Sequence, residues 1–478
     1  MAVKYEMVAG LETHVELSTR TKIFCGCTTA FGGEPNTHCC PICIGLPGTL
    51  PKLNERVVEY AIKAGLATHC RIAENARMDR KNYVYPDLPK AYQISQFDKP
   101  LCEGGYVELS NGRKIRLTRI HIEEDAGKLV HERGDTYVDY NRGGVPLIEI
   151  VSEPDIRSID EAKEYLEKIQ LIMKYIGVSD CKMQEGSLRC DVNISLRPVG
   201  SEKFGTRCEI KNMNSFTYME KAMKYEFERQ ADILDSGEEV IQETRRYDVE
   251  SGCTESMRGK EDAQDYRYFR EPDLVAIYTP REKVEKLREQ LPELPDSRMK
   301  RYTEMGISPA DGVLLVKYQA VARYFDAAAE GVKNPKNVSN FMVGQMFRRM
   351  PTEEEKERCT IVSVVPPENL KALVMLLDEG KIRMNQAKTV LETMMDTGKA
   401  PSELISAEDM AGVDQNDLLE VCRKVIGENA ANVADYLGGK ERAIQPMIGA
   451  VMRATKGKAD AKAAQQILKQ LMEEGAKQ

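Results

Sequence analysis

The sequence predicts an α+β protein in which a sheet-rich N-terminal part is followed by helices. The alternation of polar and apolar residues that is typical of strands recurs as far as about Asp273, and helical spacing dominates after the proline-containing stretch Leu291–Asp296. A chain of 478 residues is too long for one core, and about 150 residues per domain suggests three domains. We expect a sheet domain over residues 1–293, a helical domain over 294–405 and a helical tail over 406–478.

Composition and charge favour a soluble cytoplasmic protein. The chain holds 68 basic and 76 acidic residues, a formal net charge of −8, so its overall charge does not indicate nucleic-acid binding. Its first residues lack the apolar core of a signal peptide, and no apolar run approaches the ~20 residues that span a bilayer. The thirteen cysteines are therefore expected to be reduced thiols, some of them metal ligands, rather than disulfides.

The clearest alternation lies near the N-terminus, at residues 7–16. As a strand, this stretch directs its apolar side chains to one face and three polar side chains, Glu12, His14 and Glu16, to the other. Two carboxylates and an imidazole in a row suit a divalent cation. The alternative is a sheet with one solvated, charged face. We favour the cation because later segments repeat the same pattern.

A cysteine motif follows the first strand directly. Cys25 and Cys27 form a CxC pair, and Cys40 and Cys43 form a CxxC pair after twelve intervening residues, with Cys39 as a spare. Two chelating pairs joined by a short loop can surround a tetrahedral zinc ion, whereas chance clustering of buried cysteines is the alternative. Four cysteine ligands leave no open coordination position, so the sequence predicts a structural zinc knuckle over residues 25–43.

Several further elements carry polar residues on expected strands. A hairpin around Asn111-Gly112 leads into the consecutive acids Glu123, Glu124 and Asp125, whose oxygens suit Mg²⁺. Glu149 lies inside an otherwise apolar strand, where an acid is expensive unless it is paired, binds a metal or lies at an exposed edge.

Two more strands are expected at residues 183–196 and 206–216. The first places Arg189, Asp191, Asn193 and Ser195 on one face, and the second places Glu209 and Lys211 on one face. Amphipathic helices are expected between these strands, at residues 54–66, 160–176 and 218–234. Three polar segments are expected to be loops: 79–96 (with two prolines), 244–247 and 265–273.

The C-terminal part shows helical spacing and a basic end. Helices are expected at four places: 320–329, 338–349, 368–377 and 384–396. Residues 440–478 hold eight lysines and arginines against four acids, including Arg453, Lys456, Lys458, Lys462 and Lys469. Such a segment can contact a phosphate backbone, although exposed helix faces carry similar charge routinely.

The chain lacks the sequence motifs of several common classes of enzyme. The chain has no GxxxxGK[ST] loop, GxGxxG turn, HExxH pair or GxSxG elbow, and no cysteine outside the knuckle has a recognisable nucleophile setting. Covalent catalysis by serine or cysteine is therefore not expected. A set of carboxylates, one histidine and several cationic side chains instead favours metal-assisted handling of phosphates.

Six long motifs together resemble the B-subunit family of the tRNA-dependent amidotransferases. They are GLETHVEL (10–17), the segment 79–96, HIEEDAGK (121–128), the segment 142–155, EGSLRCD (185–191) and YRYFREPD (266–273). The resemblance covers essentially the whole chain, and the tail is similar to the YqeY-like domain of that family. Arg270, where family members commonly have proline, is a departure within a loop.

The resemblance implies a glutamine-synthetase-like antiparallel cradle, a helical domain and a tRNA-binding tail. It also implies a heterotrimer with A and C subunits that acts on Glu-tRNA(Gln) and Asp-tRNA(Asn). The B subunit would use ATP and Mg²⁺ to convert the misacylated carboxylate into an acyl phosphate. Ammonia from the glutaminase A subunit would then form the amide, giving Gln-tRNA(Gln) or Asn-tRNA(Asn).

Residue roles follow from the same resemblance. The implied catalytic and metal-binding set, which would also handle ammonia, is Glu12, His14, Glu124 and Glu149. Glu16, Glu123, Asp125 and Asp191 are second choices. The implied contacts to ATP or the carboxylate are Lys81, Arg142, Arg189, Asp191 and Lys211. The zinc would be structural and dispensable for the chemistry.

Two rival functions explain less of the sequence. A non-catalytic RNA-binding scaffold accounts for the knuckle and the basic tail, but it leaves the acids on the expected strands without a role. A free-standing small-molecule ligase that resembles glutamine synthetase accounts for the acids but not for the tail. ATP cleavage that requires aminoacyl-tRNA would separate the three.

Overall fold

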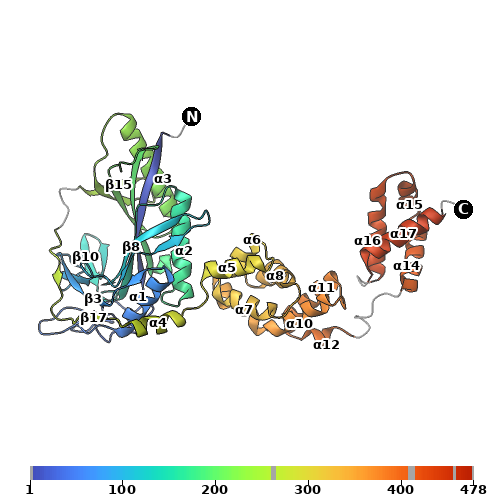
Figure 1. Cartoon of the computed structure of the whole chain (residues 1–478), viewed down its shortest axis with the longest axis horizontal. Coiled ribbons are helices and arrows are strands. Elements are labelled where there is room, and N and C mark those ends of the chain that lie inside the picture. The colour runs from blue at the N-terminus through green and yellow to red at the C-terminus, as the bar shows by residue number, and fades with distance from the viewer. Residues whose placement is uncertain (1–3, 260–264, 407–414, 456–458, 476–478) are drawn as a thin grey trace. The chain divides into compact units, whose positions relative to one another are not determined.

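The computed structural model describes residues 4–259, 265–406, 415–455 and 459–475. The chain divides into two compact units, residues 1–295 and 296–478 (Figure 1). The first unit contains a large sheet with helices, and the second is helical, so the predicted α+β class is confirmed. Among the described residues, no helix is long and apolar enough to cross a membrane.

One sheet of ten strands dominates the described part of the first unit. Its strand order is β15-β14-β13-β12-β1-β11-β8-β6-β2, with β7 paired to β8. All of these neighbours are antiparallel except β13 and β14, which run parallel. The strands are β1 (Tyr5–Glu16), β2 (Arg71–Ile72), β6 (Cys102–Glu103), β7 (Tyr106–Glu108), β8 (Lys114–Glu124), β11 (Pro146–Ser152), β12 (Leu188–Pro198), β13 (Cys208–Met213), β14 (Glu243–Tyr247) and β15 (Thr254–Gly259).

The central strand β1 has the two-faced character that its alternation predicts. Leu11 and Val15 are fully buried, whereas Glu12, His14 and Glu16 are half-buried on the opposite face. Side chains of the buried face pack in a hydrophobic core with residues of three helices, α1 (Glu55–Ala67), α2 (Ile159–Tyr175) and α3 (Phe216–Asp235). Figure 1 shows these helices along one side of the sheet. The other face of the sheet therefore carries the polar residues.

The three helices begin within two residues of their predicted starts. Asn54, Ser158 and Ser215 each accept a hydrogen bond from a backbone N–H in the first turn, which satisfies one of the free donors there. The hairpin expected at Asn111-Gly112 is also confirmed, because β7 pairs with β8 and Gly112 has a φ of 80°. A left-handed conformation of this kind favours glycine.

All three segments expected to be loops contain strands instead. Within residues 79–96, β4 (Asp79–Asn82) pairs with β5 (Tyr92–Ser95), and the two prolines lie in the connection between them. A two-residue strand of the segment 265–273, β16 (Phe269–Arg270), pairs with β4 on its other side. Residues 244–247 form most of β14. Polar composition misled the prediction because these strands face polar surroundings on one side.

Shorter elements complete the first unit. They are β3 (Asn75–Ala76), β9 (Lys128–Glu132), β10 (Asp135–Asp139), β17 (Ile277–Tyr278), the 3-10 turn η1 (Met183–Glu185) and α4 (Arg281–Glu289). The strand expected from residue 183 thus begins only at Leu188, after this turn.

The second unit is helical throughout its described residues. Its elements are α5 (Pro295–Glu304), α6 (Pro309–Lys317), α7 (Gln319–Ala329), α8 (Pro335–Gly344), η3 (Met346–Arg349), α9 (Glu353–Arg358), η4 (Thr360–Ser363), α10 (Pro367–Asp378), α11 (Met384–Thr397), α12 (Pro401–Leu404), α14 (Gln415–Glu428), α15 (Ala430–Leu437), η5 (Glu441–Ala443), α16 (Ile444–Ala454) and α17 (Ala461–Gly475). A separate hydrophobic core joins buried residues between Leu418 and Met472. Lys456 and Lys458 of the basic tail lie outside the described residues.

Candidate functional site

The polar face of the sheet gathers a first group of metal-binding side chains. His14 of β1 lies opposite Glu149 of β11, and Glu149 lies opposite His121 of β8. The Nε2 atom of His14 is 3.4 Å from Glu123 Oε1 and 3.8 Å from Glu149 Oε2. The Nε2 atom of His121 is 3.1 Å from the same Glu149 oxygen. His14, Glu123 and Glu149 place one ligand atom each within 4.8 Å of one another and could hold a metal ion.

The charge of Glu149 is stabilised by its neighbours. Burial alone would raise the pKa of this carboxyl, but His121, His14 and Lys81 together lower it far below its usual value. Glu149 is therefore ionised at neutral pH although its side chain is only 14% exposed. An ionised carboxylate and imidazole nitrogens are suitable ligands for a divalent cation.

A second group lies beside the first, across β1. Register places Glu12 opposite Asp191 of β12, and Asn193 opposite Glu209 of β13. Glu12, Asp191 and Glu209 also place their carboxylate oxygens within 4.8 Å of one another. Burial and the nearby charge of Glu149 raise the pKa of Glu12, while Asn193 donates a hydrogen bond of 2.9 Å to it. Glu12 is thus a more basic carboxylate than Glu149.

Lys211 lies between two acids of this second group. Its Nζ atom donates to Asp191 Oδ2 at 2.8 Å and is 2.9 Å from Glu209 Oε1. Burial opposes the charged form of this lysine, but Asp191 and Glu209 outweigh it and raise the lysine pKa. The group therefore already holds one positive charge, which offsets the repulsion among three carboxylates.

A pair of arginines borders the first group. Arg189 donates to Asp125 Oδ2 at 2.8 Å, and Arg142 Nε lies 3.4 Å from the same oxygen. Arg142 also donates to the carbonyls of Ala126 and Gly127 at 3.0 and 2.9 Å, which fixes its turn. Burial and Asp125 raise the pKa of Glu16 to about 8. The Arg189 Nε atom is buried and has no hydrogen-bond partner.

Lys81 of β4 lies near the first group, and tyrosine rings surround its ammonium group. Its Nζ atom is 4.7 Å from the ring centre of Tyr266 and 5.9 Å from that of Tyr83. Burial opposes its charge, but Glu123 and the neighbouring tyrosines outweigh this effect and raise its pKa. Lys81 therefore places a positive charge next to the carboxylate of Glu123.

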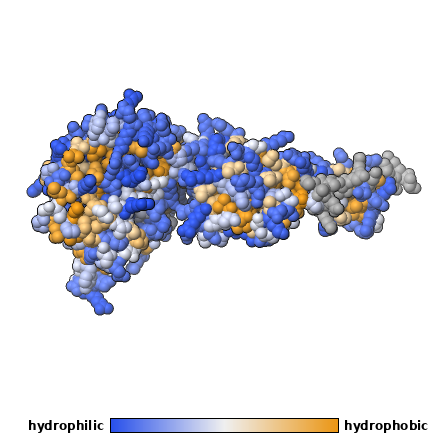
Figure 2. All heavy atoms as spheres, turned by 90° about the horizontal axis from the view of Figure 1, so that it is seen from below, coloured by the Kyte–Doolittle hydropathy of each residue, from blue (hydrophilic) through white to orange (hydrophobic). Residues whose placement is uncertain are grey.

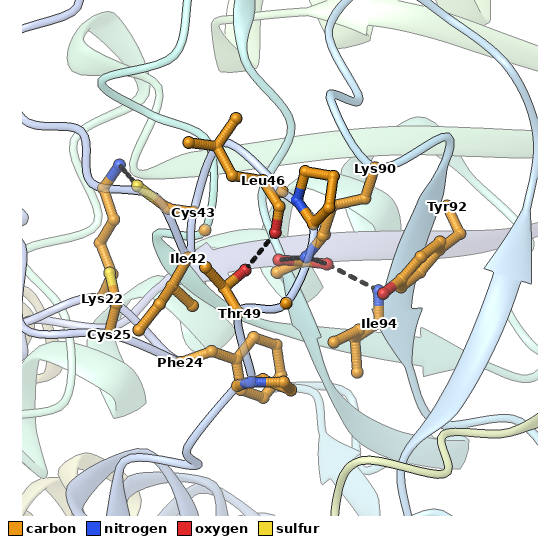
Figure 3. A pocket seen from close by; sticks show the side chains of 16 residues that line it. Lys22, Phe24, Cys25, Ile42, Cys43, Leu46, Thr49, Lys90, Tyr92 and Ile94 are labelled. Atoms are coloured by element: carbon orange, nitrogen blue, oxygen red, sulfur yellow. Dashed lines mark hydrogen bonds and ion pairs between the residues drawn. The ribbon is translucent and has the colours of Figure 1, made fainter.

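Glu124 points away from the other predicted acids. It follows Glu123 on β8, so its side chain lies on the opposite face of the strand. Lys90 donates to both of its oxygens at 2.6 and 2.7 Å, and the backbone N–H of Ile94 donates at 2.8 Å. Glu124 and Lys90 line a pocket of about 210 Å³ that also touches Cys25 and Cys43 (Figure 3).

The four cysteines of the predicted knuckle meet as expected. The sulfur atoms of Cys25, Cys27, Cys40 and Cys43 all lie within 4.8 Å of one another and could hold a metal ion. Tetrahedral zinc with thiolate ligands needs sulfurs about 3.8 Å apart, so the donor set fits zinc. A hydrogen bond from Cys25 lowers the pKa of Cys43 to about 4. Lys22, which is fully buried, lies 3.8 Å from the Cys43 sulfur.

We expect Cys43→Ser to abolish this cluster. The variant should lose the roughly one zinc ion per chain that the wild type retains, because a hydroxyl is a poor replacement for a thiolate ligand. Metal content after dialysis measures the effect, and Cys39→Ser is the matched control because Cys39 is outside the cluster. Equal zinc content in Cys43→Ser and the wild type would contradict the ligand set.

The structure brings together most, but not all, of the predicted residues. Glu12, His14, Glu149 and Asp191 belong to the two groups, with Lys81, Lys211 and Arg189 around them. Glu123, a second choice, takes the place in the first group that Glu124 was expected to fill. His121, Asn193 and Glu209 were missed as site residues. The alternation along β8 and β13 points to His121 and Glu209, because each shares a face with a site residue.

Two groups of cation ligands, flanked by lysines and arginines, are typical of an enzyme that handles phosphates with divalent metals. Comparison with protein-family models gives two matches that agree with this class. The model described as "GatB/GatE catalytic domain" matches residues 7–285, and the model described as "GatB domain" matches residues 323–472.

Curated relatives extend the match to the full chain. The B subunit of the aspartyl/glutamyl-tRNA(Asn/Gln) amidotransferase from Thermoanaerobacter sp. (strain X514) is 52% identical over 476 residues, which cover 98% of this chain and 99% of the relative. The B subunit of the same name from Clostridium botulinum (strain 657 / Type Ba4) is 50% identical over 480 residues, 99% of each chain. The chain belongs to the family of aspartyl/glutamyl-tRNA(Asn/Gln) amidotransferase B subunits, which form part of a ligase.

Proposed function

We propose that the polar face of the sheet activates the side-chain carboxylate of a misacylated aminoacyl-tRNA with ATP. The substrates would be Glu-tRNA(Gln) and Asp-tRNA(Asn), the two that the names of the relatives imply. The observation that carries the proposal is the pair of ligand groups on adjacent strands, His14–Glu123–Glu149 and Glu12–Asp191–Glu209. A glutamine-synthetase-like cradle is the fold that we propose for this sheet.

The donor atoms of both groups fit Mg²⁺. Carboxylate oxygens are the ligands that this ion prefers, and each group leaves room for water or phosphate oxygens because it offers only three protein ligands. Bound at these groups, Mg²⁺ would neutralise charge on the ATP phosphates and orient them. Glu123, Glu149 and His14 would hold the first ion, and Glu12, Asp191 and Glu209 would hold the second.

The chain's own residues then account for the two chemical steps. In the first, an oxygen of the substrate carboxylate attacks the γ-phosphorus, and the bond to the bridging oxygen of ADP breaks. Lys81, Lys211 and Arg189 would stabilise the negative charge on the transferring phosphoryl group, with Arg142 holding the turn beside them. Asp191 keeps Lys211 in place through its hydrogen bond.

In the second step, ammonia attacks the carbonyl carbon and phosphate leaves. The attacking nitrogen must lose a proton, and a carboxylate or imidazole beside the substrate is suited to accept it. Glu12, through an oxygen that does not bind the ion, is the proposed base, and His14 is the alternative. Glu124, held by Lys90 in its pocket, retains the proposed role of handling ammonia.

Partners and the remaining segments complete the proposal. Ammonia would come from a glutaminase A subunit, with a C subunit as the third member of a heterotrimer. Large apolar side chains are exposed on the first unit, among them Phe31, Leu50 and Val84 at 77%, 65% and 82%, and hydrophobic patches are visible on its surface (Figure 2). Such patches support contact with other subunits.

We also propose that the four cysteines hold a structural zinc ion and that the C-terminal helices bind tRNA. The separate core between Leu418 and Met472 supports an independent YqeY-like tail within residues 406–478, with a helical domain over 294–405 before it. Described basic residues of the tail include Arg453, Lys462 and Lys469, which are suited to phosphate contacts.

ATP cleavage by the chain assembled with its A and C partners tests the proposed function. We expect Glu-tRNA(Gln) to stimulate ADP release strongly, because the carboxylate that accepts the phosphoryl group is on that substrate. Uncharged tRNA(Gln) is the matched control. Tight tRNA binding without stimulated ADP release would contradict the proposal and favour an RNA-binding scaffold.

A further inference from the structure

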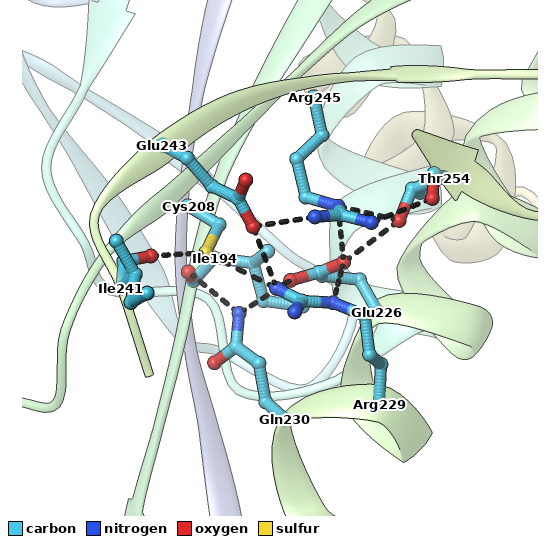
Figure 4. Close-up of polar contacts among 9 residues, drawn as sticks. All are labelled: Ile194, Cys208, Glu226, Arg229, Gln230, Ile241, Glu243, Arg245 and Thr254. Carbon is cyan, nitrogen blue, oxygen red and sulfur yellow. Dashed lines mark hydrogen bonds and ion pairs between the residues drawn. The ribbon is translucent and has the colours of Figure 1, made fainter. Parts of the chain in front are cut away.

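A fully buried glutamate on α3 is the centre of a polar network behind the sheet. Glu226 is 0% exposed and accepts hydrogen bonds from Arg229 at 2.6 and 3.0 Å and from Gln230 at 2.9 Å. The hydroxyl of Thr254, on β15, donates to it at 3.0 Å. Figure 4 shows these side chains converging on its carboxylate. A buried carboxylate is stable only with such partners, so the network ties α3 to β15.

The network also holds β14, which lies between β13 and β15. Arg245 of β14 donates to the hydroxyl and the carbonyl of Thr254 at 2.8 and 2.6 Å, and its Nε atom is 3.5 Å from Glu226 Oε2. Glu243, at the start of β14, forms ion pairs with Arg245 and Arg229. The negative charges of Glu226 and Glu243 are thus compensated by the positive charges of Arg229 and Arg245, and these ion pairs hold β14 against α3.

The opposite face of β14 belongs to the site. Side chains alternate along a strand, so Thr244 points away from the network that holds Glu243 and Arg245. The Thr244 hydroxyl donates to Glu209 Oε2 at 2.9 Å, while the other oxygen of Glu209 lies 2.9 Å from Lys211. Thr244 therefore fixes the orientation of a carboxylate in the second ligand group.

Backbone pairing also holds β14. It runs antiparallel to β15 over five residue pairs and parallel to β13 over three, one of which is Glu209 with Thr244. Displacement of β14 would therefore remove the hydroxyl from Glu209. We propose that Glu226 is a positioning residue: through Arg245 it holds β14 in place, and through Thr244 it orients Glu209 for cation binding. This inference rests on the proposed function of the second group as a cation site.

Binding of Mn²⁺ to the complex, followed by electron paramagnetic resonance, tests the inference without an activity assay. Outer hydrogen-bond partners of metal ligands typically change metal affinity by about 10-fold to 100-fold. We expect Thr244→Val, which removes only the donor, to weaken one of two Mn²⁺ binding steps by about tenfold. Glu226→Gln should weaken the same step, and Thr244→Ser should bind as the wild type does. Glu228→Gln is the matched control, because Glu228 is exposed on the same helix.

The double variant Glu226→Gln/Thr244→Val tests whether Glu226 affects Mn²⁺ binding through Thr244 or independently of it. If Glu226 acts through Thr244, Glu226→Gln should have little further effect on Mn²⁺ affinity when Thr244 is already valine. Equal weakening by Glu226→Gln in both backgrounds would overturn the inference. Thr244→Val tests the second half of the route even if the Glu226 variant does not fold.

Glu209→Gln separates failure of this inference from failure of the proposed function. Wild-type Mn²⁺ binding by Thr244→Val, together with weakened binding by Glu209→Gln, would overturn the positioning role alone. Unchanged binding by Glu209→Gln would overturn the cation function of the second group, and the positioning role with it.

Discussion

Replacing Glu149 by glutamine is expected to reduce tRNA-dependent ATP cleavage by about 100-fold or more, the effect typical of removing a charge that stabilises the transition state. Glutamine preserves the size of the side chain but removes the negative charge that lies 3.1 Å from His121 and 3.8 Å from His14. The first ligand group would then keep one carboxylate, Glu123, which is a weak site for Mg²⁺. The rate of ADP release with saturating Glu-tRNA(Gln) measures the effect.

Glu153→Gln is the matched control for this experiment. Glu153 follows the end of the same strand, and its carboxylate accepts a hydrogen bond from Thr118 at 2.7 Å, outside both ligand groups. This variant should cleave ATP at close to the wild-type rate. Near-normal cleavage by Glu149→Gln as well would show that the first group does not take part in the chemistry.

Replacing Arg189 by methionine is expected to destabilise the first unit by about 3 kcal/mol or more, because removing one partner of a buried ion pair leaves an uncompensated charge. Asp125 is only 4% exposed and accepts a 2.8 Å hydrogen bond from Arg189, so it is the charge that would remain. Arg142, at 3.4 Å, would compensate only in part. Chemical unfolding of the variant and the wild type at pH 7 measures the difference in free energy.

A second substitution tests the cause of that loss. Asp125→Asn in the Arg189→Met background removes the unpaired charge, so the double variant should be more stable than Arg189→Met alone. If the double variant unfolds as easily as the single one, the loss is due to packing of the arginine rather than to its charge.

The same pair contributes to stability in a pH-dependent way. Burial would raise the pKa of Asp125, but Arg189 and Arg142 outweigh it and lower the pKa below the usual value. An acid with a lowered pKa in the folded state contributes stability that is present above its unfolded pKa of about 4 and is lost as the pH falls further. Wild-type stability should therefore fall more steeply below about pH 4 than that of Asp125→Asn.

Local patterns in the sequence were sufficient for much of this structure. The alternation of residues 7–16 predicted which side chains of β1 face the site, and the spacing of Cys25, Cys27, Cys40 and Cys43 predicted their cluster. Helical spacing predicted α1 and α2, which begin at Glu55 and Ile159. Each of these features depends on neighbours in the chain, and such features are the ones that sequence patterns report.

Glu123 and Glu124 show how the structure bears on residue roles carried over from a resemblance. Both are adjacent acids at the end of β8, and the family resemblance alone led to Glu124. Alternation along β8 places Glu123 on the face of His14 and Glu149, whereas Glu124 shares the other face with Ile120 and Ile122. The period of the strand thus indicates which of the two neighbouring acids lies beside the first ligand group.

Other parts of the site depend on contacts between distant segments. The register that places Glu12 opposite Asp191, and His14 opposite Glu149, is set by pairing of strands more than 130 residues apart. Residues 244–247 were expected to be a loop because their composition is polar, but they form most of β14, which pairs with β13 and β15 and makes ionic contacts with α3. Pairing of this kind is a property of the whole fold rather than of a local pattern.

Transfer of an oxygen atom from substrate to phosphate tests the central claim most directly. If the site forms an acyl phosphate, an oxygen of the glutamate side chain remains bonded to phosphorus when ammonia displaces the phosphate. Glu-tRNA(Gln) labelled with ¹⁸O in that carboxylate should therefore give one labelled oxygen per phosphate released, as measured by mass spectrometry during amidation by the complex. Amide formation with unlabelled phosphate would contradict an acyl phosphate and with it the role proposed for this face of the sheet.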